Sequence, residues 1–154
     1  MTNKPSNTDN RSGKSKARYV LEDQVGHLLR RANQRHTAIF AASIGRAELT
    51  PTQFAALVKI RDCTEVSQNR LGRLTAMDPA TVQGVVKRLK ERRLIKDRPD
   101  PDDRRRSLWR LSTRGEKLLS EALTNAQMIS ATTLQPITAS ERKTLTRLLK
   151  KLSD

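Results

Sequence analysis

The chain is poor in cysteine, in aromatic residues and in long apolar segments. Cys63 is the single cysteine, so no internal disulfide can form, and the aromatic residues are one tryptophan, one tyrosine and two phenylalanines. The core must therefore come from Leu, Ile, Val and Ala, which favours helices over sheets. No apolar run approaches the roughly 20 residues of a membrane-spanning helix, and no signal-peptide pattern opens the chain. We expect a cytoplasmic protein without a membrane partner.

Acidic residues are scarce relative to basic ones. The 154 residues include 31 Lys and Arg but 16 Asp and Glu, which gives a formal net charge of +15. An excess of this size repels itself, and its usual reason is an acidic partner, either nucleic acid or an anionic membrane surface.

Residues that commonly act in catalysis are scarce as well. The chain holds two histidines and one cysteine, and we find no Gly-rich phosphate loop and no cluster with metal-ligand spacing. The sequence therefore predicts a protein that is not an enzyme and uses no cofactor.

The N-terminal part divides into a polar arm and a long helix. Residues 1–17 are mostly Asn, Ser, Lys and Thr, and we expect a disordered basic arm, either a solubilising tail or a segment that touches DNA. From Tyr19 to about Arg46, apolar residues recur at spacings of three and four, which predicts one amphipathic helix that Gly45 closes. Such a long helix often packs on a second chain.

Residues 49–111 carry the most informative pattern. Thr50 is expected to cap a helix, with Gln53 completing a capping box. Ser67 is expected to cap a short helix from Gln68 to about Ala76, and Asp78 a second one over residues 79–93. The free face of that second helix is polar and basic. This pattern favours a helix-turn-helix, whose second helix fits the DNA major groove, over a solvated helical hairpin.

Residues 94–100 and 106–112 predict two short strands around the segment "PDPDDRRRS" (residues 99–107). A calcium loop counted from Asp100 would need Gly at its sixth position and Glu at its twelfth, where the chain has Arg105 and Leu111. A solvated turn remains open, because exposed Asp–Arg pairs are weak. We favour a third interpretation, a wing in which aspartates hold an arginine toward the DNA minor groove.

The last part of the chain predicts two more helices. Ser112 caps one that runs to about Leu134, before Pro136. Thr138 and Glu141 form a capping box for the final amphipathic helix.

The order of these elements resembles the MarR family, from Tyr19 to the C-terminus. The resemblance rests on "LTPTQFAALVKI" and on "LGRLTAMDPATVQGVVKRLKERRLIKDRPDPDDRRRSLWRLSTRGEKLL". It implies a mainly α fold with a small β-hairpin wing, namely a winged helix-turn-helix over residues 49–111. Residues 18–48 and 112–154 would form the helical dimerisation region of a homodimer.

The resemblance also implies a DNA-binding surface. The residues that would lie on or beside the major groove are Pro79, Ala80, Thr81, Gln83, Gly84, Lys87 and Arg88. Arg105 would be the wing-tip arginine, with Arg104 as a neighbouring DNA contact, and Asp103 would orient the wing.

Proteins of this family commonly repress transcription, and many release DNA when a small aromatic or phenolic acid binds. The predicted effector-binding residues are Arg18, Arg35, His36, Phe40, Phe54 and Trp109. For His36, an ordinary hydrogen-bonded packing role stays open beside a role as donor to an anionic ligand. The sequence thus predicts a ligand-responsive regulator that binds a near-palindromic operator, with a non-specific architectural DNA-binding protein as the alternative.

Overall fold

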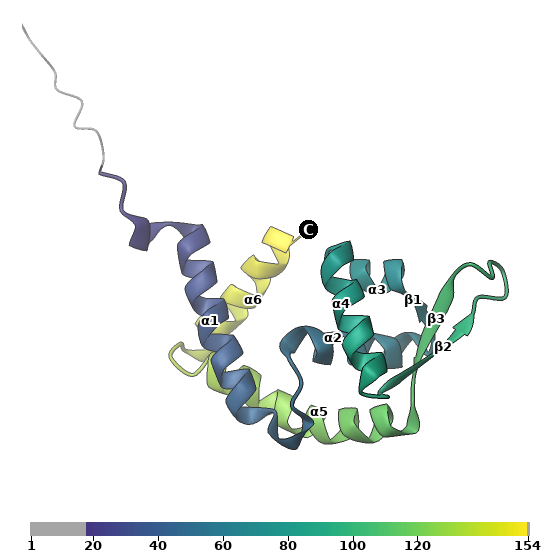
Figure 1. The fold of residues 1–154 in the computed structure, drawn as a ribbon. Helices are drawn as coiled ribbons and strands as arrows, with labels where there is room; N and C mark the ends of the chain where they lie inside the picture. Colours follow the sequence, from purple (N-terminus) through teal and green to yellow (C-terminus); the bar gives the residue numbers. More distant parts are fainter. Residues whose placement is uncertain (1–17, 154) are drawn as a thin grey trace, which may run out of the picture.

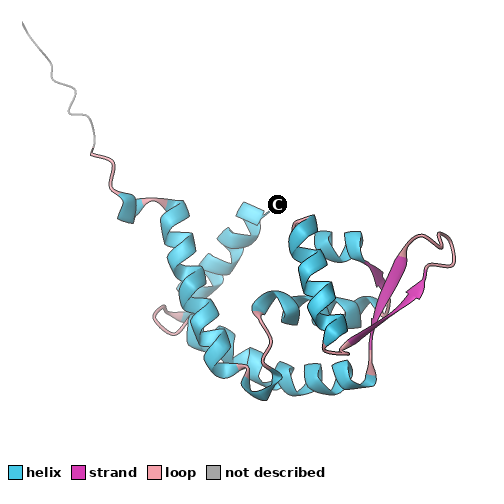
Figure 2. Cartoon of the chain, in the orientation of Figure 1, coloured by secondary structure: helices cyan, strands magenta, loops and turns pink. Residues whose placement is uncertain are grey.

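Helices build most of the chain, and one small sheet interrupts them (Figure 2). The structure is a computed structural model and describes residues 18–153, so the predicted arm over residues 1–17 lies outside the described residues. The helices are η1 (Leu21–Asp23), α1 (Val25–Ser43), η2 (Gly45–Ala47), α2 (Pro51–Cys63), α3 (Gln68–Leu74), α4 (Pro79–Glu91), α5 (Thr113–Thr133) and α6 (Ala139–Ser153). The strands are β1 (Val66–Ser67), β2 (Ile95–Pro99) and β3 (Ser107–Leu111).

Local capping signals place most helix starts correctly. The hydroxyl of Thr50 accepts from the backbone N–H of Gln53, and the Gln53 side chain accepts from the backbone N–H of Thr50, which completes the predicted capping box of α2. Asp78 and Ser112 cap α4 and α5 in the same way. Each cap satisfies backbone donors that the first turn of a helix leaves free. The predicted helices α2, α4, α5 and α6 are therefore confirmed, to within two residues at their ends.

The first helix is shorter than the sequence pattern indicates. Instead of one helix from Tyr19 to about Arg46, residues 21–23 form a 3-10 turn, Gln24 is extended, and α1 begins at Val25. The Gln24 side chain donates to the carbonyl of Val20 and makes no cap hydrogen bond to the helix. At the other end Gly45 adopts a φ of 69°, a left-handed conformation that ends the helix as predicted.

The sheet contains a strand that the sequence analysis missed. β1 pairs antiparallel with β3, which also pairs with β2, so the strand order is β1-β3-β2. Two residues are too few for a period-two pattern to be visible. The predicted cap by Ser67 is also wrong, because its side chain makes no bond to α3 and instead accepts from the guanidinium of Arg106.

One hydrophobic core joins the helices to the sheet. Its largest fully buried side chains come from several elements of the middle region and from α5: Leu57, Ile60, Val66, Leu71, Leu89, Leu94, Leu119 and Ile129. At Gly115, a Cβ would lie 2.0 Å from the backbone oxygen of Leu94, so this position must lack a side chain for α5 to pack against the base of the wing. Aromatic residues are few in this core, as the composition predicts.

The long helix α5 connects the two ends of the molecule. In Figure 1 it runs along the bottom of the view, from the β2–β3 wing to the end where α1 and α6 stand. α1 packs along α5, whereas α6 has no buried residue. Among residues 18–153, no helix is both long and apolar enough to cross a membrane.

Candidate nucleic-acid interface

Helices α3 and α4 form a helix-turn-helix whose second helix has one free face. Val82, Val85, Val86 and Leu89 bury the inner face of α4 in the core. The predicted groove residues are on the other face: Pro79, Ala80, Thr81, Gln83, Lys87 and Arg88 are exposed and Gly84 is half-buried. The structure therefore brings all seven predicted major-groove residues onto one accessible helix.

The start of α4 is fixed by a two-point contact. The carboxylate of Asp78 accepts from the backbone N–H of Thr81 at 2.9 Å and from its hydroxyl at 2.6 Å. Both hydrogen bonds lower the pKa of Asp78 below its ordinary 3.8, and the one from the Thr81 side chain contributes most. As a result, the Thr81 hydroxyl is turned toward its cap and holds the first turn of the recognition helix rigid.

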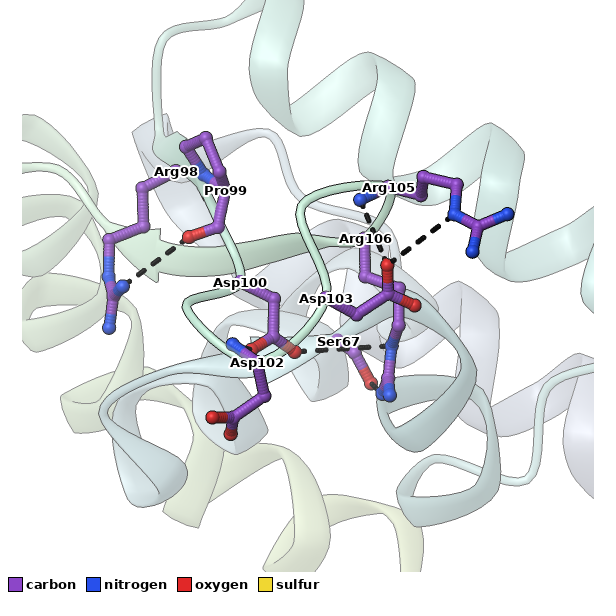
Figure 3. A network of polar contacts seen from close by, with 8 residues as sticks. All are labelled: Ser67, Arg98, Pro99, Asp100, Asp102, Asp103, Arg105 and Arg106. Carbon is purple, nitrogen blue, oxygen red and sulfur yellow. Dashed lines mark hydrogen bonds and ion pairs between the residues drawn. The ribbon is translucent and has the colours of Figure 1, made fainter.

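The wing loop is organised by Asp100 at its base. This side chain, 8% exposed, accepts from the backbone N–H of Asp102 at 3.0 Å, and the Asp100 backbone N–H donates to the carbonyl of Arg106 at 2.9 Å. The Arg106 guanidinium lies 4.0 Å from the Asp100 carboxylate and donates to the hydroxyl of Ser67 (Figure 3). The loop is thus tied to β1 from inside.

The tip of the loop has a different arrangement. The Asp103 carboxylate accepts from the backbone N–H of Arg105 at 3.0 Å and lies 3.8 Å from its Nε. The Arg105 side chain is 97% exposed and extends away from the loop in Figure 3. Asp103 therefore fixes the backbone turn beneath Arg105 and leaves its guanidinium free. Arg104 is also exposed at the tip.

The sequence analysis assigned no role to Arg106, and the structure places it at the base of the wing. All three consecutive arginines are exposed, and Arg106 is the one whose side chain reaches Asp100 and Ser67. Its partner Ser67 lies 39 residues away in the chain. No local pattern distinguishes this arginine from its neighbours, so only the fold reveals its contacts.

A second ion pair connects the wing to the end of α2. Arg98 on β2 binds Glu65 through two hydrogen bonds, of which the one from Nε is 2.7 Å long. The hydrogen bond from Arg98 holds the pKa of Glu65 below its ordinary 4.5, and the Arg98 charge adds to the effect. The wing is therefore anchored at two points, by Arg106 at the base of its loop and by Arg98 along β2.

Arg92, at the end of α4, reaches the segment that connects α1 to α2. Its guanidinium donates to the backbone carbonyls of Ala47 at 2.8 Å and Glu48 at 3.0 Å. Glu48 has a left-handed backbone with φ 46°, a conformation that non-glycine residues rarely adopt. The recognition helix is thus joined directly to the connection from α1. This contact is absent from the sequence-based predictions because it spans more than 40 residues.

Three of the predicted effector residues lie together and three do not. The Phe40 ring lies 6.2 Å from His36 and 5.7 Å from Phe54 between ring centroids. Arg18 and Arg35 are exposed. Trp109 belongs to the wing instead, where Lys90 lies 5.4 Å above its ring and its buried indole N–H has no acceptor among the described residues. The prediction that Trp109 stands beside His36 and Phe40 has no contact to support it.

His36 has a hydrogen-bond partner on α5. Its Nδ1 lies 3.1 Å from the hydroxyl of Thr133, which in turn donates to the carbonyl of Ile129 at 2.8 Å. Because a hydroxyl has one proton to donate, the Nδ1 of His36 must be the donor to Thr133. His36 therefore has the packing role that the sequence left open, and its Nε2 stays available to another group.

These features define the class of the protein as a winged helix-turn-helix DNA-binding protein. Within the described range 18–153, no group of three His, Cys, Asp or Glu residues is placed to hold a metal ion.

The MarR family model matches residues 47–106. The chain is 43% identical to the HTH-type transcriptional repressor NicR of Pseudomonas putida, over 88% of this chain and 86% of that protein. It belongs to the MarR family of transcriptional regulators.

Two solved structures extend the comparison. The structure of Bordetella bronchiseptica BpsR, whose DNA binding is regulated by 6-hydroxynicotinic acid, is 42% identical with a TM-score of 0.84, over 89% of this chain and 98% of that one. A mutant MarR from E. coli in complex with operator DNA is 25% identical with a TM-score of 0.77, over 82% of this chain and 91% of that one. The winged-helix fold predicted from the sequence is confirmed.

Proposed function

We propose that this protein is a transcriptional repressor that binds a near-palindromic operator as a homodimer and leaves it when a small aromatic acid binds. The observation that carries the proposal is the pairing of a free basic face on α4 with an anchored wing whose tip arginine is exposed. A helix of this kind fits the major groove, and an arginine at a wing tip fits the adjacent minor groove. The relation to the repressor NicR supports the direction of control.

The homodimer is supported by apolar side chains that the single chain leaves uncovered. α6 exposes four leucines, and residues 19–29 expose six further large apolar residues. An exposed apolar surface of this kind marks a protein interface. A two-fold axis would place two recognition helices one turn of DNA, about 34 Å, apart, which is why we propose an operator with two related halves.

We propose that the aromatic acid binds beside His36, Phe40 and Phe54, where α1 and α2 meet. Phe40 and Phe54 would supply the apolar wall, and Arg35, the residue before His36, would meet the carboxylate. The Nε2 of His36 would accept a hydrogen bond from a ring hydroxyl or N–H of the ligand. By analogy with BpsR, 6-hydroxynicotinic acid is the first acid to test. The contact from Arg92 to the carbonyls of residues 47 and 48 offers a route from this region to α4.

The thermodynamic requirement on such a ligand is simple. The ligand binds two arrangements of the helices, one that fits the operator and one that does not. It can lower the affinity for DNA by no more than the difference between its own affinities for these two arrangements. A movement of α1 relative to α2 would reach α4 through Arg92. The arrangement in which the two recognition helices have the spacing that fits DNA would then be less populated.

The experiment is footprinting on the DNA upstream of the protein's own gene, with and without 6-hydroxynicotinic acid. The proposal expects a protected segment with two-fold symmetry that the acid reopens. An architectural DNA-binding protein would instead protect random DNA equally well, because its ratio of specific to non-specific affinity is small. Uniform protection would therefore favour the alternative function.

The effector site has its own test in a His36→Ala variant. We expect operator affinity to stay unchanged, because His36 lies on α1 away from α4, and the acid concentration needed for release to rise by roughly tenfold. Fluorescence anisotropy of a labelled operator would measure both quantities. Release at the wild-type concentration would leave His36 with its packing role to Thr133 alone.

We further propose that the protein acts in the cytoplasm and catalyses no reaction. The proposal is supported by its family membership and by the scarcity of histidine and cysteine in the sequence.

A further inference from the structure

Two cations face each other across the wing. Lys96 on β2 and Arg110 on β3 are partners in the antiparallel register, and both side chains are exposed. Neither forms an ion pair with any residue that the structure describes. Like charges directly opposite one another on neighbouring strands destabilise the pair. The hydrogen bonds from Arg98 lower the pKa of Glu65 and the Arg110 charge helps to lower it, so the fold compensates this cross-strand cation pair only in part.

The cation pair lines a cavity at the root of the wing, where α2 ends and α5 begins. The cavity has a volume of about 610 Å³. Ile60 and Leu111 give it an apolar wall, and Thr64 and Thr113 add two hydroxyl-bearing side chains. Apolar walls with a few convergent polar groups are what small-molecule sites are made of.

The remaining charges of the cavity leave it positive. Arg61 also lines it, although Asp62 accepts two hydrogen bonds from the Arg61 guanidinium. Glu116 is the acidic residue of the lining. Three cations against one lining carboxylate favour an anionic occupant, and the cation pair contributes the two charges that form no ion pair within the described chain.

This cavity is separate from the face that α4 presents to DNA. Lys90 of α4 lies over the Trp109 ring and 3.2 Å from the Asp97 carboxylate, so both of these wing residues face the recognition helix. Successive side chains of a strand point to opposite faces. Lys96 is the chain neighbour of Asp97, and Arg110 that of Trp109. The cation pair therefore points to the other face of the sheet.

We propose that this cavity binds a small organic molecule with a carboxylate or phosphate group, and that the group lies between Lys96 and Arg110. The anion replaces their repulsion by two charge-assisted hydrogen bonds, and the apolar part of the ligand lies against Ile60 and Leu111. The site is distinct from the proposed effector site at His36 and does not depend on the proposed function.

The first test is thermal unfolding of the full chain, in the wild type and in the variants Lys96→Gln and Arg110→Gln. In chloride alone, each variant should unfold about 1 to 2 °C higher than the wild type, because the repulsion is gone. Added benzoate should raise the unfolding temperature of the wild type by more than that of either variant, because the variants keep only the proposed site at His36. Lys151→Gln, which removes one exposed charge from α6, should behave like the wild type.

Calorimetric titration separates the sources of the anionic group. We expect benzoate to bind His36→Ala, in which the proposed effector site is weakened, at one site per chain, and roughly tenfold more weakly when Lys96→Gln is added. Inorganic phosphate binding with the same dependence on Lys96 would support an oxyanion site that recognises the charged group alone. The proposal is overturned if neither anion binds the wild type, or if benzoate binding survives in Lys96→Gln and is lost in His36→Ala.

A DNA titration tests the remaining possibility that the cation pair contacts phosphates of the duplex. If the cavity faces away from DNA, Lys96→Gln should keep the wild-type slope of binding against salt concentration. A slope reduced by about one unit would assign Lys96 to the DNA interface and overturn the small-molecule site.

Discussion

Arg105 is the residue that we propose as the contact of the wing tip with DNA. Its side chain is 97% exposed, and Asp103 restrains its backbone more closely than its guanidinium. We expect Arg105→Ala to weaken operator binding and to reduce the salt slope by about one unit, because one phosphate-neutralising charge is lost. Titrations of a labelled operator at several salt concentrations measure both.

Arg106→Ala provides the matched comparison for that prediction. It removes the same charge from the same loop, but from a side chain that contacts Ser67 and Asp100. Arg106→Ala should therefore lower the unfolding temperature, which Arg105→Ala should not. Equal salt slopes for the wild type and Arg105→Ala would remove the wing tip from the DNA interface.

Gly84 is a second residue for which we propose a role in DNA binding. It lies in the middle of α4, where glycine is about 1 kcal/mol less favourable than alanine, yet an added Cβ would meet no atom of the chain within 4 Å. Nothing within the described chain therefore requires a glycine, whereas close approach of the helix to the bases would. We expect Gly84→Ala to raise the unfolding temperature and weaken operator binding, measured by calorimetry and anisotropy.

Ser120→Ala is the control for Gly84, since it improves helix propensity at an exposed position of α5 and should leave DNA binding unchanged. If Gly84→Ala binds the operator as tightly as the wild type, the free space beside Gly84 does not accommodate DNA.

Single residues also show where sequence-based prediction stops. The capping roles of Thr50, Asp78 and Ser112 were predictable because each capping side chain and the backbone N–H that donates to it are three residues apart. The contact of Arg106 with β1 and the contact of Arg92 with residues 47 and 48 were not, because their partners lie about 40 residues away.

At the level of elements, the wing depends on an ion pair that responds to acid. The pKa of Glu65 is lowered by its hydrogen bond from Arg98, so the pair contributes stability above the ordinary carboxyl pKa of 4.5 and loses it as the pH falls through the lowered value. Asp78 and Glu141 have lowered pKa values for related reasons and act in the same direction. We expect the unfolding temperature to fall from about pH 5 downward.

Glu65→Gln isolates the contribution of the wing. Its unfolding temperature should fall less steeply with acid than that of the wild type, because the side chain no longer titrates. Glu91→Gln, which removes an exposed carboxylate 4.0 Å from Lys87, should retain the wild-type acid profile. Parallel acid profiles of the wild type and Glu65→Gln would show that Arg98 gains nothing from the charge of Glu65.

Elements with strong periodicity were predictable, and those without it were not. The stripes of α2, α4, α5 and α6 fixed their lengths to within two residues at each end. β1 was missed because two residues are too few to show a period. The N-terminal extension of α1 was overestimated because the exposed Leu21 continues the spacing of the apolar stripe although it lies before the helix.

At the scale of the whole molecule, the last prediction concerns the apolar residues that a single chain leaves exposed. Leu145, Leu148, Leu149 and Leu152 follow one face of α6, and each is at least 37% exposed. Because none of them is buried within the protomer, Leu149→Glu should leave the fold intact, with an unchanged helical circular-dichroism signal. A charge placed in a dimer interface should cost at least as much as the roughly 1.5 to 3 kcal/mol of a buried leucine. We therefore expect light scattering to show a monomer where the wild type is a dimer. Operator affinity should fall steeply with it, since two half-sites would no longer be bound by one molecule. Lys143→Gln changes the opposite face of the same helix and should preserve the dimer, so a dimer that persists in Leu149→Glu would place the subunit interface elsewhere.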